Sequence, residues 1–172
     1  QSGNAGLDTA ALDINAKDHD GKTAVHHAIY APYNAGRNIT ALHEASAAYG
    51  FDLHFDEKDH SGRTALDLAV TSNKIDSVKA LIAAGADIEA ADSQGGTALG
   101  LAVAQENLEI VIHLLAAGAR VDGALSDQVD QLLMSKDDRN MSALHLAVLS
   151  DDPQIITALF KQFKARYLTL DV

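Results

Sequence analysis

The chain has 172 residues, of which 47% are apolar and 22% charged, as is usual for a globular protein. It contains no cysteine, which excludes disulfides, thiolate zinc sites and cysteine nucleophiles and fits a reducing compartment, so we expect the cytoplasm or the nucleus. The chain has 13 Lys and Arg against 24 Asp and Glu, which gives a formal net charge of −11. This charge disfavours nucleic acids and anionic membranes as partners. On electrostatic grounds we expect a basic protein or peptide.

A repeat with a period of 33 residues organises the sequence. Residues 59–91 and 92–124 match at spaced Asp, Gly, Thr, Ala and Leu positions, with Thr64 aligned to Thr97. Two further copies open with similar Asp-containing turns, one near the start of the chain and one after residue 136. The first copy is eight residues longer than the period and the third is twelve longer, so each carries an insertion.

Each copy predicts a turn followed by two short helices. The Asp-x-x-Gly segment favours a turn, because Asp can bond its own turn and Gly tolerates a positive φ. Thr23, Thr64, Thr97 and Ser142 are candidate N-caps of the first helices. In the second copy an apolar stripe at helical spacing follows, and Gly85 is the candidate C-cap of that second helix. Such a helix pair cannot form a core alone, so neighbouring pairs must stack into a continuous one.

This pattern is similar to the ankyrin repeat, and the segments G-R-T-A-L-D-L-A, V-K-A-L-I-A-A-G-A-D-I and I-V-I-H-L-L-A-A-G-A carry the resemblance. The resemblance implies an all-α ankyrin-repeat solenoid of about four repeats with β-turn tips. The repeats are placed at residues 18–58, 59–91, 92–136 and 137–164, with residues 1–17 as the remnant of a preceding repeat. The family has a histidine three residues after the N-cap threonine. His26 and His145 keep it in the first and last copies, but Asp67 and Gly100 replace it in the two middle copies.

The two ends of the sequence indicate that this chain is a piece of a longer repeat array. The start is polar and is no signal peptide, and no apolar run approaches the ~18 residues of a membrane helix. The missing initiator Met indicates a chain cut from a longer one. After Phe160 the sequence stops where a fifth turn would begin.

The first insertion, near residues 30–38, is expected to be a loop between two helices. It contains Pro32, Gly36 and two asparagines, which favour irregular backbone. The second insertion, at residues 125–136, carries four apolar residues at near-helical spacing, with Ser126 as a candidate cap. We expect a short amphipathic helix there, whose apolar side either packs locally or serves as a docking ridge for a partner.

The sequence holds no constellation typical of catalysis. It has no GxSxG elbow, no P-loop and no GxGxxG, and its adjacent acidic residues lie in polar turns. His19 and His60 are expected at equivalent turn tips, one repeat apart, and His113 at the surface of a second helix. Without cysteine or an HExxH spacing, we expect no metal site, no cofactor and no enzymatic activity.

Asn15 is a candidate modification site. Leu7 lies eight residues before it, and Asp13 and Ile14 directly precede it. This resembles the ankyrin sites that are hydroxylated by the asparaginyl hydroxylase that also acts on hypoxia-inducible factor. The alternative is that Asn15 only stabilises the turn between repeats.

The resemblance implies a non-catalytic module that binds a protein or peptide through its turn tips and concave helix face. The expected contact residues are His19, Asp20, Lys22, Tyr30, Tyr33, His60, Ser61, Arg63, Thr71, Ser72, Ser93, Gln94, Gln105, Asp138, Arg139, Met141 and Leu149. Tyr, Arg and Met are favoured interface anchors, so Tyr30, Tyr33, Arg63, Arg139 and Met141 are expected to contribute most. The alternatives are a regulatory or autoinhibitory segment of a larger enzyme or channel, and self-association through the repeat ends or the 125–136 ridge.

Overall fold

The computed structural model describes residues 13–121, 125–135, 142–150 and 152–167, with side chains up to residue 164. Over these ranges the chain forms nine helices and no strand, which confirms the expected all-α solenoid. The helices are Ala24–Ile29 (α1), Ala35–Tyr49 (α2), Ala65–Thr71 (α3), Ile75–Ala83 (α4), Ala98–Ala104 (α5), Leu108–Ala116 (α6), Ser126–Met134 (α7), Ala143–Leu149 (α8) and Pro153–Tyr167 (α9).

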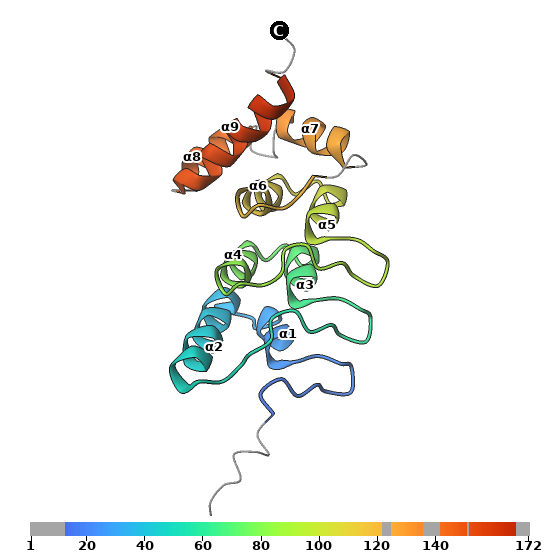
Figure 1. Cartoon of the computed structure of the whole chain (residues 1–172), viewed down its shortest axis with the longest axis vertical. Helices are drawn as coiled ribbons and strands as arrows, with labels where there is room; N and C mark the ends of the chain where they lie inside the picture. Colours follow the sequence, from blue (N-terminus) through green and yellow to red (C-terminus); the bar gives the residue numbers. More distant parts are fainter. Residues whose placement is uncertain (1–12, 122–124, 136–141, 151, 168–172) are drawn as a thin grey trace, which may run out of the picture.

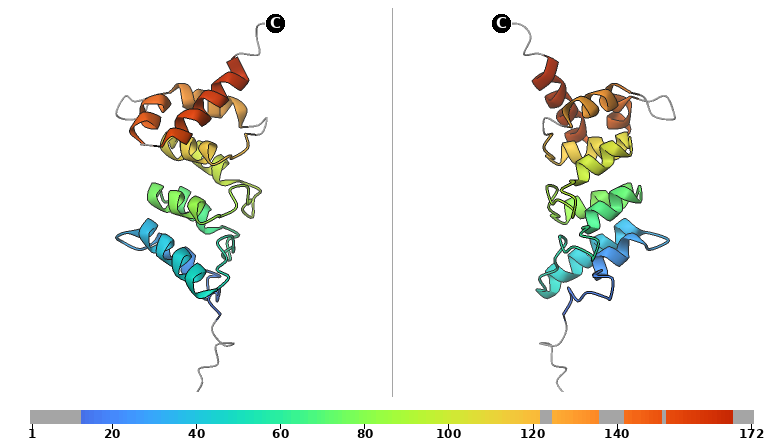
Figure 2. Two further views of the ribbon diagram at one scale, coloured as in Figure 1. Left: turned by 60° about the vertical axis from the view of Figure 1, so that its left-hand side comes forward. Right: turned by 90° about the vertical axis from the view of Figure 1, so that its right-hand side faces the viewer.

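The helices stack in two rows along the long axis of the molecule (Figure 1). One row contains the first helices α1, α3 and α5, and long turns project from its side (Figure 1). The other row contains the second helices α2, α4, α6 and α9, each packed against the next. Two further views show the helix pairs as successive layers (Figure 2). The elongated stack therefore has one continuous core shared between neighbouring pairs.

The first helices are buried on more than one side, because each lies between two neighbours. In α3, Ala65, Ala69 and Val70 are completely buried, since α1, α5 and α4 all pack against this helix. Among the second helices of the repeats, α6 is the most apolar, and every residue from Ile110 to Leu115 is buried. That run includes His113, which is 8% exposed, so the expectation that this histidine lies at the surface is wrong.

The predicted helix signals are present in the backbone. Thr64 Oγ1 accepts a hydrogen bond from the Asp67 N–H at 3.2 Å, which caps the first turn of α3. At the other end of the pair, Ala84 is the C-cap of α4 and Gly85 follows it with a φ of +87°. The Gly85 N–H bonds the Ile82 carbonyl at 3.1 Å, and the next N–H bonds the Leu81 carbonyl at 3.0 Å. This closure needs the left-handed backbone that glycine adopts without strain.

The first insertion lengthens a helix instead of forming a nine-residue loop. Only residues 30–34 lie outside the helices, and Asn34 takes the left-handed N-cap position at a φ of 59°. Gly36 is then the second residue of the 15-residue α2, packed against α4, where a Cβ would come within 2.6 Å of the Asp76 carbonyl oxygen. Glycine stands here because two helices approach closely, so the expectation of irregular backbone at this residue is wrong.

The second insertion forms the expected amphipathic helix, α7. It buries Val129, Leu132 and Leu133, although Leu125 and not Ser126 occupies its N-cap position. The helix lies against α5 and α6, whereas α8 packs on α6 and α9 (Figure 1). The insertion thus occupies the place above α5 that a regular repeat gives to its own first helix.

This displacement leaves one side of α8 uncovered within the described part of the chain. Leu144 and Val148 correspond by the repeat alignment to Leu99 and Val103 of α5. The α5 residues are 1% and 6% exposed, whereas the α8 residues are 43% and 63% exposed. Two apolar positions that are buried in α5 are therefore open to solvent in α8.

Candidate binding surface

In the first three repeats, one aspartate holds each projecting turn. The Oδ1 atom of Asp59 accepts the backbone N–H groups of Ser61 and Arg63, both at 2.9 Å. Asp18 and Asp92 make the same pair of bonds in their own turns. The bond from the Lys22 backbone, with the contact to His27, lowers the pKa of Asp18 to about 2. Asp18 therefore stays ionised at neutral pH while its carboxylate holds its own turn.

Successive turns are stacked on one another. The His60 N–H donates to the Asp20 carbonyl at 2.9 Å, and Ser93 Oγ donates to the Ser61 carbonyl at the same distance. A Cβ at Gly62 would lie 2.5 Å from the Ser93 Cβ, so the turns approach too closely for a larger residue. The tips therefore form a continuous, ordered row from the first repeat to the third.

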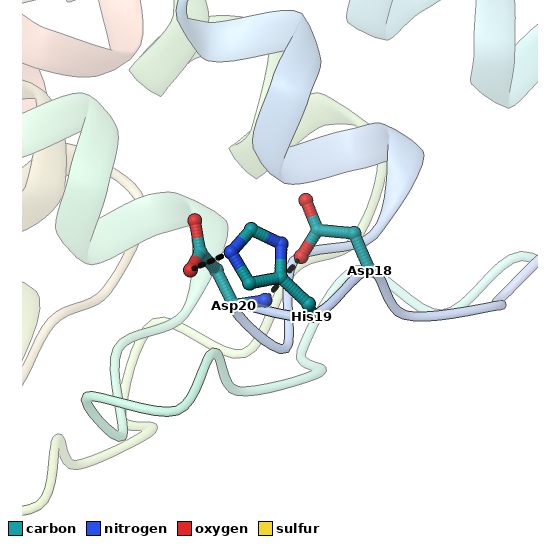
Figure 3. Close-up of side chains that lie close together, drawn as sticks. All are labelled: Asp18, His19 and Asp20. Carbon is teal, nitrogen blue, oxygen red and sulfur yellow. Dashed lines mark hydrogen bonds and ion pairs between the residues drawn. The ribbon is translucent and has the colours of Figure 1, made fainter.

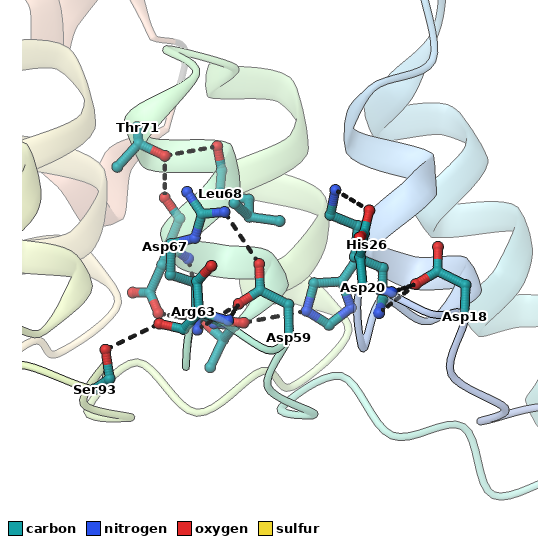
Figure 4. A network of polar contacts seen from close by, with 12 residues as sticks. Asp18, Asp20, His26, Asp59, Arg63, Asp67, Leu68, Thr71 and Ser93 are labelled. Carbon is teal, nitrogen blue, oxygen red and sulfur yellow. Dashed lines mark hydrogen bonds and ion pairs between the residues drawn. The ribbon is translucent and has the colours of Figure 1, made fainter.

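A buried polar network links the first two repeats (Figure 4). The Thr23 N–H donates to Nδ1 of His26 at 3.2 Å, which leaves the Nε2–H of a neutral imidazole to donate to the Arg63 carbonyl at 3.2 Å. Burial lowers the pKa of His26, in keeping with that neutral form. The Thr23 hydroxyl also lies 2.9 Å from Nδ1 of His26, so this histidine contacts both its own cap residue and the next turn. His145 contacts the Ser142 hydroxyl at 2.7 Å, but its side chain is exposed.

Asp67 replaces this histidine in the second repeat and makes only half of the network. Its Oδ2 accepts the Thr64 N–H at 2.9 Å and the Thr64 hydroxyl at 3.0 Å, but its buried Oδ1 has no hydrogen-bond partner. Burial raises the pKa of this carboxyl above its usual range. The second repeat therefore lacks the side-chain link to the next turn that His26 provides in the first.

Restoring the histidine should stabilise the protein. We expect Asp67→His to raise the free energy of unfolding by roughly 1–2 kcal/mol, because it removes an unpaired buried carboxylate oxygen and supplies an N–H to the Gly96 carbonyl. The reciprocal variant His26→Asp should lower stability by a similar amount. Urea denaturation at pH 7 measures both. A lower stability for Asp67→His would contradict this account of the site.

Arg63 is less available to a partner than the sequence indicated. Its Nη2 donates to Asp59 Oδ2 at 3.1 Å, and its buried Nε has no hydrogen-bond partner. Burial would raise the pKa of Asp59, but the Arg63 backbone bond and guanidinium charge together hold that pKa below its ordinary value. The Arg63 guanidinium therefore stabilises its own turn, and its contact with a partner stays a prediction.

The other expected contact residues fall into two groups along the described surface. His19, Asp20, His60, Ser61, Ser93 and Gln94 are exposed at the tips, and Lys22 is half-buried. On the helix side, Tyr30 is 51% exposed, with the Lys22 ammonium 5.4 Å from its ring centre. Thr71 and Gln105 are exposed, Ser72 is half-buried, and Gln105 bonds the Thr71 carbonyl at 3.3 Å. The Lys22–Tyr30 contact thus joins the first tip to the end of α1, and the Gln105–Thr71 bond joins the ends of α3 and α5.

Two of the expected residues that the structure describes do not join this surface. Tyr33 is 82% exposed, but it lies in the connection between α1 and α2. Leu149 is 68% exposed, yet α8 packs on α6, so this leucine does not continue the row of first helices. The three expected tip residues of the last repeat, Asp138, Arg139 and Met141, lie outside the described residues.

The Asn15 side chain links two repeats. Its amide nitrogen donates to the Asp52 carbonyl at 2.8 Å, and its oxygen accepts the His54 N–H at 2.9 Å. A hydrogen bond that the His54 ring donates to the Glu57 carboxylate raises the pKa of this neighbouring histidine. Because both ends of the amide are bonded, the geometry favours the structural alternative, and hydroxylation of Asn15 stays a prediction.

One group of side chains in the described structure has the spacing of metal ligands, a feature that sequence reasoning missed. Asp18, His19 and Asp20 place one ligand atom each within 4.8 Å of one another (Figure 3). All three are exposed, and the Asp18 carboxylate already bonds its own turn and His27. Consecutive residues of one turn explain this closeness, so the group carries no metal assignment here.

The stacked helix pairs and their row of aspartate turns define a helical-repeat protein whose exposed features are tips and first helices. The family of ankyrin repeats, in three copies, matches residues 5–92 and 42–124. Because these matches span most of the sequence, the chain belongs to the ankyrin-repeat family. A comparison with curated proteins found no match. No helix in the described part of the chain is long and apolar enough to cross a membrane.

Proposed function

We propose that this protein is a non-catalytic binding module that holds a protein or peptide against its turn tips and the adjoining ends of α1, α3 and α5. Ankyrin repeats are generally protein–protein interaction modules, which supports this class of function. The observation that carries the proposal is the stacked row of turns. Bonds such as that from the His60 N–H to Asp20 fix the backbone, while the side chains of His60 and Gln94 stay exposed.

A rigid row of this kind lowers the entropic cost of binding, because the contact backbone is ordered before the partner arrives. The net charge of −11 favours a basic partner. Tyr30 is the best candidate for an energetic contact, since an exposed aromatic ring beside the tips can be covered by a partner. The cytoplasm or the nucleus is the proposed compartment.

The proposal is tested by partner capture followed by affinity measurement. A partner identified with the chain as bait is titrated against wild type, Tyr30→Ala, Gln94→Ala and the control Tyr49→Ala. Tyr49 is a matched exposed tyrosine on α2, the row away from the tips. We expect Tyr30→Ala to weaken binding at least tenfold and Tyr49→Ala to leave it unchanged. Equal affinities for all four proteins would reject this surface.

A further inference from the structure

A second surface lies between α2 and α4, across the array from the projecting turns (Figure 1). It is a groove of about 680 Å³ between the starts of these two helices. Apolar side chains, among them Pro32, Ile75 and Ala83, line part of it, and Asn34, Thr40 and Asn73 line the rest. None of the residues assigned to the proposed tip surface lines this groove.

The first insertion builds one wall of the groove. The additional residues of the first repeat form the connection after α1 and extend the start of α2. Gly36 then lies against the backbone of Asp76, where a Cβ would come within 2.6 Å of the carbonyl oxygen. This close approach brings Arg37, the next residue of α2, alongside the start of α4.

Three cations line this groove, namely Arg37, Lys74 and Lys79. All three are exposed, and none forms an ion pair with another part of the described structure. Lys17, Lys22, Arg63 and Arg120, in contrast, form ion pairs, as Lys17 does with Glu57 at 2.7 Å. Asp76 is the acidic residue of the lining, so the groove has a formal charge of +2 on a chain with a net charge of −11.

We propose that this groove binds an acidic peptide segment, one whose carboxylates reach Arg37, Lys74 and Lys79 while its aliphatic side chains contact the apolar wall. The overall negative charge does not prevent this, because charges more than about 8 Å away are largely screened at physiological ionic strength. Among the residues that line the groove, the three unpaired cations outnumber the single carboxylate of Asp76. Arg37 also offers a planar guanidinium, which suits a carboxylate through two parallel bonds.

The proposal assigns the module two binding faces with opposite charge preferences. The tips favour a basic partner by the overall charge, whereas the groove favours an acidic segment by its local charge. Because the two faces share no residue, loss of one is not expected to remove the other. The insertion of the first repeat would thereby provide a binding groove that the regular repeats lack.

Fluorescence anisotropy tests the groove with a labelled peptide made of three copies of Glu-Leu-Glu-Gly. The comparison peptide carries Gln in place of Glu. We expect the acidic peptide to bind at least tenfold more tightly than the Gln peptide, and Arg37→Glu with Lys79→Glu to weaken its binding about tenfold. The amide NMR signals of residues 34–40 and 73–83 should shift on titration.

The matched control is Lys161→Glu with Lys164→Glu, which makes the same change in net charge on exposed positions of α9. It should change the affinity less than twofold. Equal losses in the two double variants would mean that only the net charge matters and would overturn the proposal. So would equal binding of the two peptides, or binding to anionic phospholipid vesicles in place of the acidic peptide. If the reversed charges unfold the chain, Arg37→Gln with Lys79→Gln must still weaken binding.

Discussion

Alanine at Gly36 is expected to destabilise this protein, although alanine normally stabilises a helix relative to glycine by roughly 0.5–1 kcal/mol. The added Cβ would lie 2.6 Å from the Asp76 carbonyl oxygen and 2.8 Å from its carbonyl carbon. Because both atoms belong to the backbone of α4, relief requires the two helices to move apart. Overpacking of this kind costs about 1–3 kcal/mol, so we expect a net loss of roughly 1–2 kcal/mol.

Gly100 provides the matched control, since it is also a glycine near the start of a helix, α5. A Cβ there would meet its nearest neighbours, Leu125 and Thr97, at 3.8 Å, which is ordinary contact. We therefore expect Gly100→Ala to raise the free energy of unfolding by roughly 0.5–1 kcal/mol. Thermal and urea denaturation of both variants at pH 7 measure the difference. A stabilised Gly36→Ala would show that α2 and α4 are not in close contact.

The parts of the fold that the sequence predicts are those encoded locally. An aspartate turn such as Asp59–Gly62 and a cap such as Thr64 specify their own geometry within a few residues. The helix of the second insertion is local too, because its apolar spacing alone indicates the buried residues Val129, Leu132 and Leu133. Periodicity and capping chemistry therefore suffice for the stack of helix pairs.

The parts that the sequence does not predict depend on packing between distant residues. Gly36 favours irregular backbone when it is considered alone, and only the close approach of Asp76 explains a glycine inside α2. Likewise, the apolar spacing of α7 does not say that this helix lies on α5 and that α8 packs on α6. His113 was placed at the surface because α9, which helps to cover α6, comes from a repeat 45 residues later.

The same distinction applies to the candidate surface. Turn periodicity predicts the tips His60, Ser61 and Gln94, and the structure places them in one exposed row. It does not predict that Arg63 is paired with Asp59. The cationic groove was also missed, because Arg37 lies more than 35 residues before Lys74 and Lys79 and no motif connects them.

Low pH should destabilise the packing of α6 against its neighbouring helices, because it favours protonation of the buried His113. This side chain is 8% exposed, its Nε2 is buried without a hydrogen-bond partner, and burial, with a further contribution from Lys79, lowers its pKa to about 4. The pKa of this histidine is lower in the folded state than its ordinary value of 6.5 in the unfolded state. Its contribution to the free energy of unfolding is therefore fully present above pH 6.5. That stability is lost as the pH falls toward 4, because the unfolded chain takes up the proton first.

His113→Leu should remove this pH dependence, because leucine fills a similar volume and carries no titratable group. From the lowered pKa, we expect wild type to lose roughly 2–3 kcal/mol more than this variant between pH 7 and pH 4. Urea denaturation at several pH values measures the difference between the two proteins, in which the titration of their shared carboxylates cancels. His19→Gln, at a side chain that is 91% exposed, is the control and should follow wild type. Parallel stability curves for wild type and His113→Leu would show that His113 can take up a proton without loosening the stack.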